Sequence, residues 1–160
     1  MTKENLKFEI LVEGIFFDKA PFLEIYVNDI IQFSDYIQGQ KKINFSYDLS
    51  FGEEHTLKLQ RSNYDLSQTM IKPNGEKIDQ VLEIKKIKID NIDCEWLCND
   101  NSYAVFDYPS HVIRNARNRE IILPEKTFGS KILTFNGTWI FNFTSPFYEY
   151  IMKRMGGGVF

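Results

Sequence analysis

The dipeptide Asn136-Gly137 is the feature that most constrains how this chain can fold. It lies within residues 131–144, between two runs that are rich in β-branched and aromatic residues. Both central residues of a type I′ turn need a positive φ, and Asn-Gly meets that need better than most pairs. The stretch therefore predicts a β-hairpin with its turn at Asn136-Gly137, in a domain built from antiparallel strands.

A short helix is expected after this hairpin, over about residues 146–155. Ser145 is a favourable N-cap, and Pro146 suits the first helical position. Lys153 and Arg154 suit the negative C-terminal end of a helix. The hairpin and the helix together are predicted to close the domain.

The first half of the chain alternates apolar and polar residues with a period of two, which is typical of half-buried strands. The predicted strands are residues 6–17, 22–27, 30–33, 43–49 and 55–61. Asn28-Asp29 marks a second two-residue hairpin turn. In residues 81–92 the apolar phase shifts, which predicts a β-bulge at Lys85-Lys86. Short strands with regular turns predict an antiparallel β-sandwich or barrel, and the length fits one domain over residues 1–160.

Charge and hydropathy exclude several classes of protein. The chain has 19 Lys and Arg residues against 22 Asp and Glu residues, a formal net charge of -3. A nucleic-acid-binding protein normally carries a basic field, so no nucleic-acid partner is expected. The first residues contain no apolar signal-peptide core, and the chain contains no apolar run of membrane-spanning length, so neither export nor membrane insertion is expected.

The sequence does not predict catalysis. Cys94 and Cys98 lack the C-x-x-C spacing of redox and zinc sites, so they are predicted to be reduced thiols. His111 lies near Asp107 in the sequence, as a general base and the acid that orients it would. His55 begins a predicted strand. No nucleophile elbow and no phosphate-binding glycine loop accompanies them. We therefore expect no catalytic residue and no enzyme activity.

Clusters of Asp and Asn raise the question of calcium. They occur at residues 63–65, 90–93 and 99–101. Calcium takes carboxylate and amide oxygens, but the EF-hand pattern is absent and such side chains commonly form turns with their own backbone. The prediction is no metal site and no cofactor, with calcium as the alternative.

Residues 93–130 lack regular patterning and are predicted to be a long interaction loop. The candidate binding residues in it are Trp96, Tyr103, Tyr108, Arg114, Arg117 and Arg119. The aromatic residues suit either a stacking platform for a sugar ring or the packing of a core or subunit contact. The arginines suit either a solvated, ion-paired face or an acidic neighbouring subunit.

Two resemblances to known families add to this reading. Residues 23–31, 55–61 and 82–92 resemble, in order and pattern, the strands of calcium-dependent xylan-binding modules. That resemblance implies a jelly-roll β-sandwich, with the family's calcium loop falling near residues 63–65. The sequence from Asn136 to Tyr148, together with residues 6–92, is similar to small virion-associated proteins of tailed, marine-type bacteriophages.

The resulting hypothesis is an all-β protein, an antiparallel jelly-roll-like β-sandwich with a short C-terminal helix. The expected function is that of a non-enzymatic structural protein of a bacteriophage tail, baseplate or capsid. It would be made in the host cytoplasm, reside in the virion in several copies, and dock onto other virion subunits through residues 93–130. The alternative is a carbohydrate-binding module, with or without calcium, that serves adsorption to host glycans.

Overall fold

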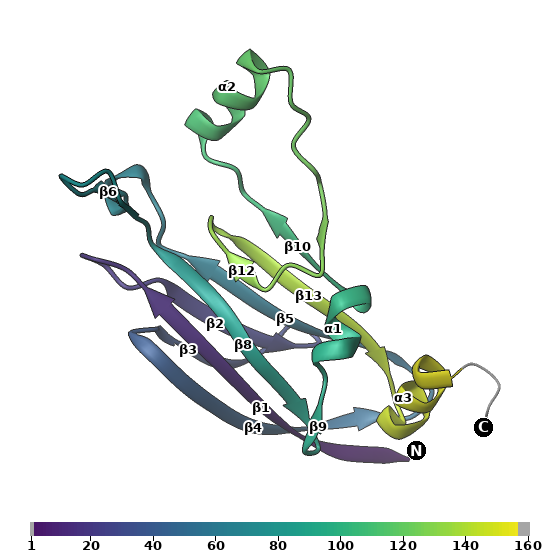
Figure 1. The fold of residues 1–160 in the computed structure, drawn as a ribbon. Helices are drawn as coiled ribbons and strands as arrows, with labels where there is room; N and C mark the ends of the chain where they lie inside the picture. The colour runs from purple at the N-terminus through teal and green to yellow at the C-terminus, as the bar shows by residue number, and fades with distance from the viewer. Residues whose placement is uncertain (1, 157–160) are drawn as a thin grey trace.

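The computed structural model describes residues 2–156, which form two antiparallel sheets around one core (Figure 1). One sheet has the order β12-β8-β1-β4, with β9 also paired to β8, and its strands are β1 (Lys3–Ile15), β4 (Gly39–Ser50), β8 (Val81–Ile89), β9 (Ile92–Asp93) and β12 (Ile132–Leu133). The other has the order β11-β10-β13-β5-β2-β3, and its strands are β2 (Phe22–Val27), β3 (Ile30–Tyr36), β5 (Glu54–Ser62), β10 (Ser102–Phe106), β11 (Thr127–Phe128) and β13 (Gly137–Thr144). The predicted antiparallel β-sandwich is confirmed.

The remaining elements are short and lie outside the two sheets. They are the 3-10 helix η1 (Leu66–Gln68), the hairpin strands β6 (Met70–Ile71) and β7 (Lys77–Ile78), and the helices α1 (Glu95–Asn101), α2 (Ser110–Asn118) and α3 (Phe147–Gly156). Within the described chain, none of these helices has the length and apolarity needed to cross a membrane.

The core follows from the period-two alternation of the strands. In β1, Leu6, Phe8, Ile10 and Val12 are buried, while the residues between them are at least partly exposed. The facing sheet contributes Leu57, Leu59, Trp139, Phe141 and Phe143, all buried. Each such side chain stabilises the fold by about 1.5–3 kcal/mol relative to leaving it in water. The half-buried strands predicted from alternation in residues 6–17 and 55–61 are therefore confirmed.

Two local predictions about turns and bulges are also confirmed. Asn28 and Asp29 have φ values of 49° and 64°, as a type I′ turn requires, and they connect β2 to β3. On β8, Lys86 pairs with Leu11 while Ile84 pairs with Val12, so Lys85 is the extra residue of a bulge.

The predicted hairpin at Asn136-Gly137 is wrong. Strands β12 and β13 belong to different sheets, and neither residue has a positive φ. The Asn136 amide is instead used in tertiary contacts: its Oδ1 accepts from the Tyr64 backbone N–H (2.9 Å) and from Arg61 Nη1 (3.3 Å). A Cβ on Gly137 would lie 2.5 Å from the Val105 carbonyl oxygen. The dipeptide therefore lies where the chain passes from one sheet to the other, and the missing side chain of Gly137 lets β10 approach closely.

Helix α3 confirms the predicted C-terminal helix, but its first turn is capped by a different group. Glu4 of β1 accepts a hydrogen bond from the backbone N–H of Phe147 at 2.7 Å through Oε2. The Ser145 hydroxyl donates to the same carboxylate. A carboxylate at this end complements the helix dipole, so the cap joins the two ends of the described chain.

The expected loop over residues 93–130 is wrong as a description of structure. The segment contains β9, α1, β10, α2 and β11, each too short for periodicity to reveal. Residues 107–126, here called the arm, leave the sandwich after β10, carry α2 and return to β11, and Figure 1 shows α2 held away from both sheets. The Tyr108 hydroxyl joins the two limbs of the arm by donating to the Pro124 carbonyl at 2.8 Å.

Candidate functional site: the outer face of the six-stranded sheet

Strand register places one row of side chains across the whole outer face of the six-stranded sheet. Direct cross-strand pairs join Phe128, Tyr103, Ile140, Lys58, Tyr26 and Ile31, in that order. Neighbouring strands lie about 4.8 Å apart, so the row is about 24 Å long. Five of these six side chains are apolar or aromatic, and the sixth is Lys58, which is ion-paired with Asp29. The outer face of the other sheet carries more ion pairs, such as Lys42–Glu9 and Lys85–Glu83.

A shallow groove of about 380 Å³ lies over the middle of this face. The residues that line it are Tyr26, Asp29, Lys58, Gln60, Val105, Thr138 and Ile140. They come from the strands β2, β5, β10 and β13 and from the turn between β2 and β3. The groove thus combines three apolar or aromatic surfaces with amide, hydroxyl, ammonium and carboxylate groups.

The polar groups of the groove are held by neighbours. Lys58 Nζ donates to Asp29 Oδ1 at 2.9 Å, and the Tyr26 hydroxyl donates to Glu24 Oε2 at 2.9 Å. The hydrogen bond to Glu24 raises the pKa of Tyr26, with smaller contributions from desolvation and from the Glu24 charge. The phenol is therefore neutral at physiological pH, and the Tyr26 ring is oriented from its hydroxyl end.

A second depression, of about 480 Å³, continues from the groove to the base of the arm. It shares Val105 with the groove and is lined mostly by apolar groups, including Phe106, Leu123 and Pro124. Beside it, Lys126 Nζ lies 4.6 Å from the centre of the Tyr103 ring, a cation–π contact that covers one face of that ring. The arm therefore forms a wall at one end of the sheet face.

The six predicted binding residues fall in three separate places. Tyr103 and Tyr108 lie at the base of the arm, next to the groove. Trp96 lies on α1 and is 39% exposed, and within residues 2–156 it forms no aromatic pair with either tyrosine. Arg114, Arg117 and Arg119 lie on α2 or at its end and are exposed. They do not form one surface with the aromatic residues.

Sequence reasoning missed the groove residues Tyr26, Lys58, Gln60, Thr138 and Ile140. The available signal was that each occupies a position facing away from the core in an alternating strand. Which outward positions become neighbours depends on the strand order, and adjacent strands here are distant in sequence.

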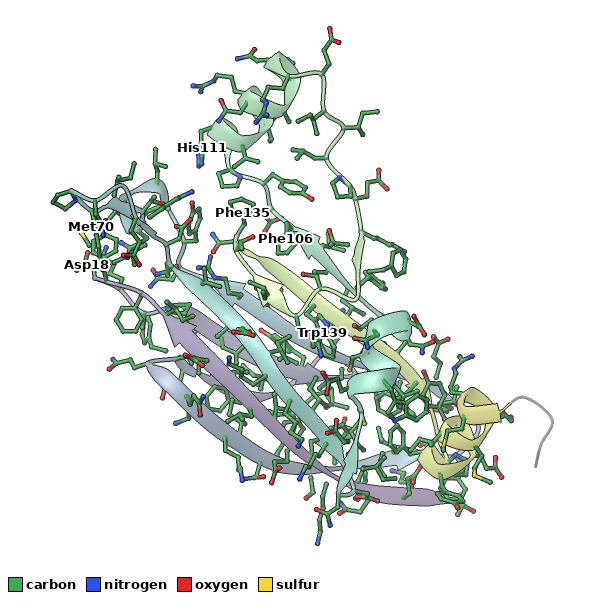
Figure 2. All side chains as sticks on the ribbon, in the orientation of Figure 1. Asp18, Met70, Phe106, His111, Phe135 and Trp139 are labelled. Atoms are coloured by element: carbon green, nitrogen blue, oxygen red, sulfur yellow. The ribbon has the colours of Figure 1, made fainter. Side chains whose placement is uncertain are left out.

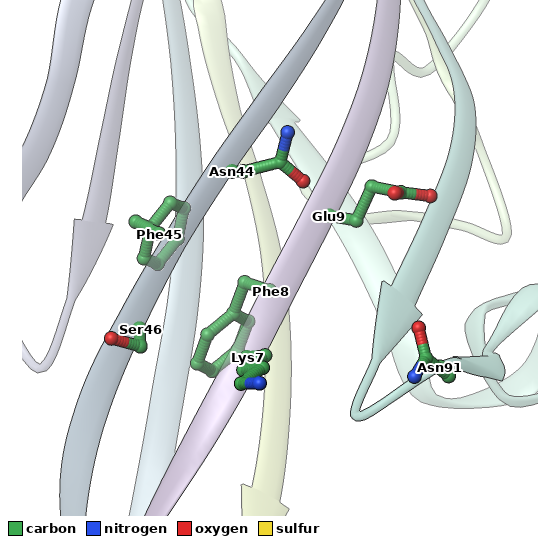
Figure 3. A pocket seen from close by; sticks show the side chains of 7 residues that line it. All are labelled: Lys7, Phe8, Glu9, Asn44, Phe45, Ser46 and Asn91. Atoms are coloured by element: carbon green, nitrogen blue, oxygen red, sulfur yellow. The ribbon is translucent and has the colours of Figure 1, made fainter.

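Another depression, of about 350 Å³, lies on the opposite side of the sandwich (Figure 3). It contains the pair Phe8 and Phe45, stacked with ring centres 5.0 Å apart, but Phe8 is buried in the core. The rest of its lining is polar and comprises Lys7, Glu9, Asn44, Ser46 and Asn91. Because its aromatic rings are committed to core packing, this depression is less suited to bind a ligand by stacking.

Side chains of the Asp and Asn clusters form hydrogen bonds with backbone groups. Near residues 63–65, Asp65 Oδ1 accepts from the Ser67 backbone N–H at 2.8 Å, and Asn63 Nδ2 donates to the Ala20 carbonyl at 2.9 Å. Asp93 Oδ1 accepts from the backbone N–H of Glu95 at 3.0 Å, at the start of α1. These contacts are the turn and cap functions expected of such side chains.

Carboxylate side chains do not gather into a cluster of three in the described part of the chain. Calcium takes six to eight oxygen ligands, usually with several carboxylates. Within residues 2–156 no three side chains of the His, Cys, Asp or Glu type come together in a group that would hold a metal ion. We therefore assign no step of ligand binding to calcium.

The histidines and cysteines of this chain are not arranged as a catalytic site in the described structure. His55 is buried, with Nδ1 2.8 Å from Asn28 Nδ2 and Nε2 2.9 Å from the Ser50 carbonyl, so both ring nitrogens are occupied. Burial raises the pKa of the Cys94 and Cys98 thiols to about 12, which keeps them protonated. His111 lies on the arm, away from the core residue Trp139 (Figure 2).

Comparison with known proteins places the fold among carbohydrate-binding modules. The sequence matches no protein-family model and no curated protein. A solved structure of the carbohydrate-binding module vCBM60 in complex with galactobiose is similar, with a TM-score of 0.50 and 10% identity over 85% of this chain and 98% of that chain. A selenomethionine form of vCBM60, described with calcium-dependent carbohydrate-binding modules, has a TM-score of 0.50 and 9% identity over 85% of this chain and 89% of that one.

The likeness defines the class of fold, a β-sandwich of the carbohydrate-binding-module type. Both similar structures are of the carbohydrate-binding module vCBM60, so the likeness gives no support to the expectation of a bacteriophage structural role.

Proposed function

We propose that the protein is a non-enzymatic carbohydrate-binding module that binds a short oligosaccharide in the groove on the six-stranded sheet. The observation that carries the proposal is the mixed lining of this groove. A pyranose ring has an apolar C–H face and a rim of hydroxyl groups. The Tyr26 ring and the Ile140 side chain can pack against the C–H face. The polar groups of Lys58, Gln60 and Asp29 can form hydrogen bonds with the hydroxyl groups.

The length of the surface supports an oligosaccharide rather than a single sugar. The row of outward side chains extends over about 24 Å of strand spacing, and the groove is shallow and continues toward the base of the arm. The fold likeness supports the same class of ligand, because one similar structure was solved in complex with galactobiose. The proposed contacts come from side chains of the sheet and need no metal ion.

The test is a glycan array, followed by calorimetric titration of the best ligand against wild type and Tyr26→Ala. Removing the ring deletes apolar contact worth about 2 kcal/mol, so the affinity should fall about 10- to 100-fold. The matched control is Tyr148→Ala, because Tyr148 is an exposed tyrosine on α3, outside the groove.

Two results would contradict this proposal. One is an array without any bound glycan at protein concentrations of about 1 mM, the weak limit of useful affinity. The other is a glycan whose affinity is unchanged by Tyr26→Ala and by Ile140→Ala. Loss of binding in EDTA, without an effect of these variants, would instead indicate a calcium-dependent site elsewhere in the chain.

A second candidate function is that of a structural component of a virion. The observation that favours it is the arm, which leaves the sandwich and exposes Ile121 and Ile122 at its tip. Such a projection suits docking onto another subunit. Detection of the protein in purified virions by mass spectrometry, without glycan binding, would support this function. Glycan binding that depends on Tyr26 would favour the first.

A further inference from the structure

Two helices that follow each other in the sequence, α1 and α2, lie in segments of equal and opposite formal charge. Residues 93–101, which contain α1, include Asp93, Glu95 and Asp100 and no Lys or Arg. Residues 110–119, which contain α2, include three arginines and no Asp or Glu. The formal charges of the two segments are therefore -3 and +3.

The fold keeps these two segments apart. Helix α1 packs on the sandwich through Leu97 and Cys98, whereas α2 lies on the arm. No ion pair within residues 2–156 joins the two helices, and none of the three arginines in α2 or at its end lies within 4 Å of a carboxylate. The acidic segment has cation neighbours in Lys86 and Lys131, both outside the arm. The three arginines thus form no ion pair with any other residue of the range 2–156.

Apolar side chains accompany the charges on both helices. On the arm, Ile113 is 43% exposed and Ile122 is 93% exposed. On α1, Trp96 is 39% exposed, and Glu95 and Asp100 of the same helix are exposed as well. An interface typically combines an apolar or aromatic centre with a charged rim, and each of the two helices carries both kinds of side chain, with charges of opposite sign.

We propose that the protein forms a two-fold symmetric dimer in which α2 of each copy docks on α1 of the other. A two-fold axis makes the contact reciprocal, since the patch that a copy offers is the complement of the patch that it accepts. A second copy is the partner that the charges favour, because the chain itself contains an acidic segment. In this segment Asp93 and Glu95 each share their charge with one lysine, and Asp100 forms no ion pair within residues 2–156. This proposal does not depend on glycan binding.

The test is sedimentation equilibrium and native mass spectrometry of the full chain and its charge variants. The wild type should dimerise, and the association should weaken at least tenfold in about 1 M salt, where exposed charges are screened. The variants Arg114→Glu/Arg117→Glu and Glu95→Lys/Asp100→Lys should each be monomeric, because like charges then face each other. The control Lys41→Glu/Lys153→Glu makes the same charge change as the first variant, on exposed lysines of β4 and α3 that belong to neither of the two helices, and should dimerise like wild type.

Mixing the two charge variants gives the sharpest result. One has two acidic helices and the other two basic helices, so an equimolar mixture should form a heterodimer although neither variant forms a homodimer. All the substituted side chains are exposed, and circular dichroism melts should match wild type. A wild-type protein that is monomeric at about 1 mM overturns the proposal, as does dimerisation that both variants retain. Capture of the monomer by an anionic polymer through the arginines also overturns it.

Discussion

Arg61 is the most informative residue for testing how the sandwich is held together. It is 1% exposed, and no carboxylate of residues 2–156 lies in ion-pair contact with its guanidinium. Nη2 donates to the Gln80 carbonyl at 2.6 Å and to Gln80 Oε1 at 2.8 Å, and Nη1 donates to Asn136 Oδ1 at 3.3 Å. The Tyr64 ring lies 5.1 Å from the guanidinium carbon, and Nε has no partner within the described residues.

Burial lowers the pKa of Arg61 to about 10, with partial compensation from Tyr64 and Asp79, so the side chain is still charged at pH 7. Its pKa in the unfolded chain is higher, so the unfolded state holds this proton more tightly. The cost of burial is therefore fully present at pH 7, and it declines only as the pH rises above about 10.

Replacing Arg61 with alanine should lower the free energy of unfolding by about 4 kcal/mol. Truncation opens a cavity and leaves the Gln80 acceptors without their donor, and each unsatisfied buried acceptor costs about 1–3 kcal/mol. Asn136 keeps its bond from the Tyr64 backbone, which limits its share of the loss. Methionine fills most of the volume and removes the buried charge, so Arg61→Met should lose about half as much.

The assay is urea unfolding followed by the fluorescence of the buried Trp139, in a Trp96→Phe background that removes the exposed tryptophan. An unchanged m-value would show that the comparison between variants is sound. A loss of less than about 1 kcal/mol in Arg61→Ala would refute the reasoning, because the polar contacts would then contribute nothing net. A methionine variant less stable than the alanine variant would refute the argument about the buried charge.

Three further expectations concern other parts of the fold. Gly137→Ala should destabilise the protein by about 2–4 kcal/mol in urea unfolding, because its Cβ would lie 2.5 Å from the Val105 carbonyl oxygen, and wild-type stability would contradict the close approach of β10. Cys94 and Cys98 should not react with a thiol reagent at pH 8 until urea unfolds the chain, since burial raises both pKa values to about 12, and rapid reaction in the folded state would show that the thiols are accessible. Glu4→Gln should cost about 0.5–1 kcal/mol in thermal unfolding through lost charge at the start of α3, and no change would count against that cap.

The sequence by itself determined the features that depend on a residue and its nearest neighbours along the chain. Alternation in β1 placed Leu6 and Phe8 in the core, because successive side chains of a strand face opposite sides. Asn28-Asp29 formed the expected turn, since its positive φ values are a local preference of these residues. The C-terminal helix followed from similar local signals, although its capping carboxylate comes from β1.

Only the tertiary structure decided where distant segments meet. Asn136-Gly137 has the local preference for a hairpin turn, but contacts with Arg61 and with β10 determined its conformation instead. The groove around Tyr26 and Ile140 exists because β2, β5, β13 and β10 are adjacent in the sheet, although they are far apart in sequence. Strand order depends on the packing of the whole core, so it cannot be predicted from a local pattern of residues.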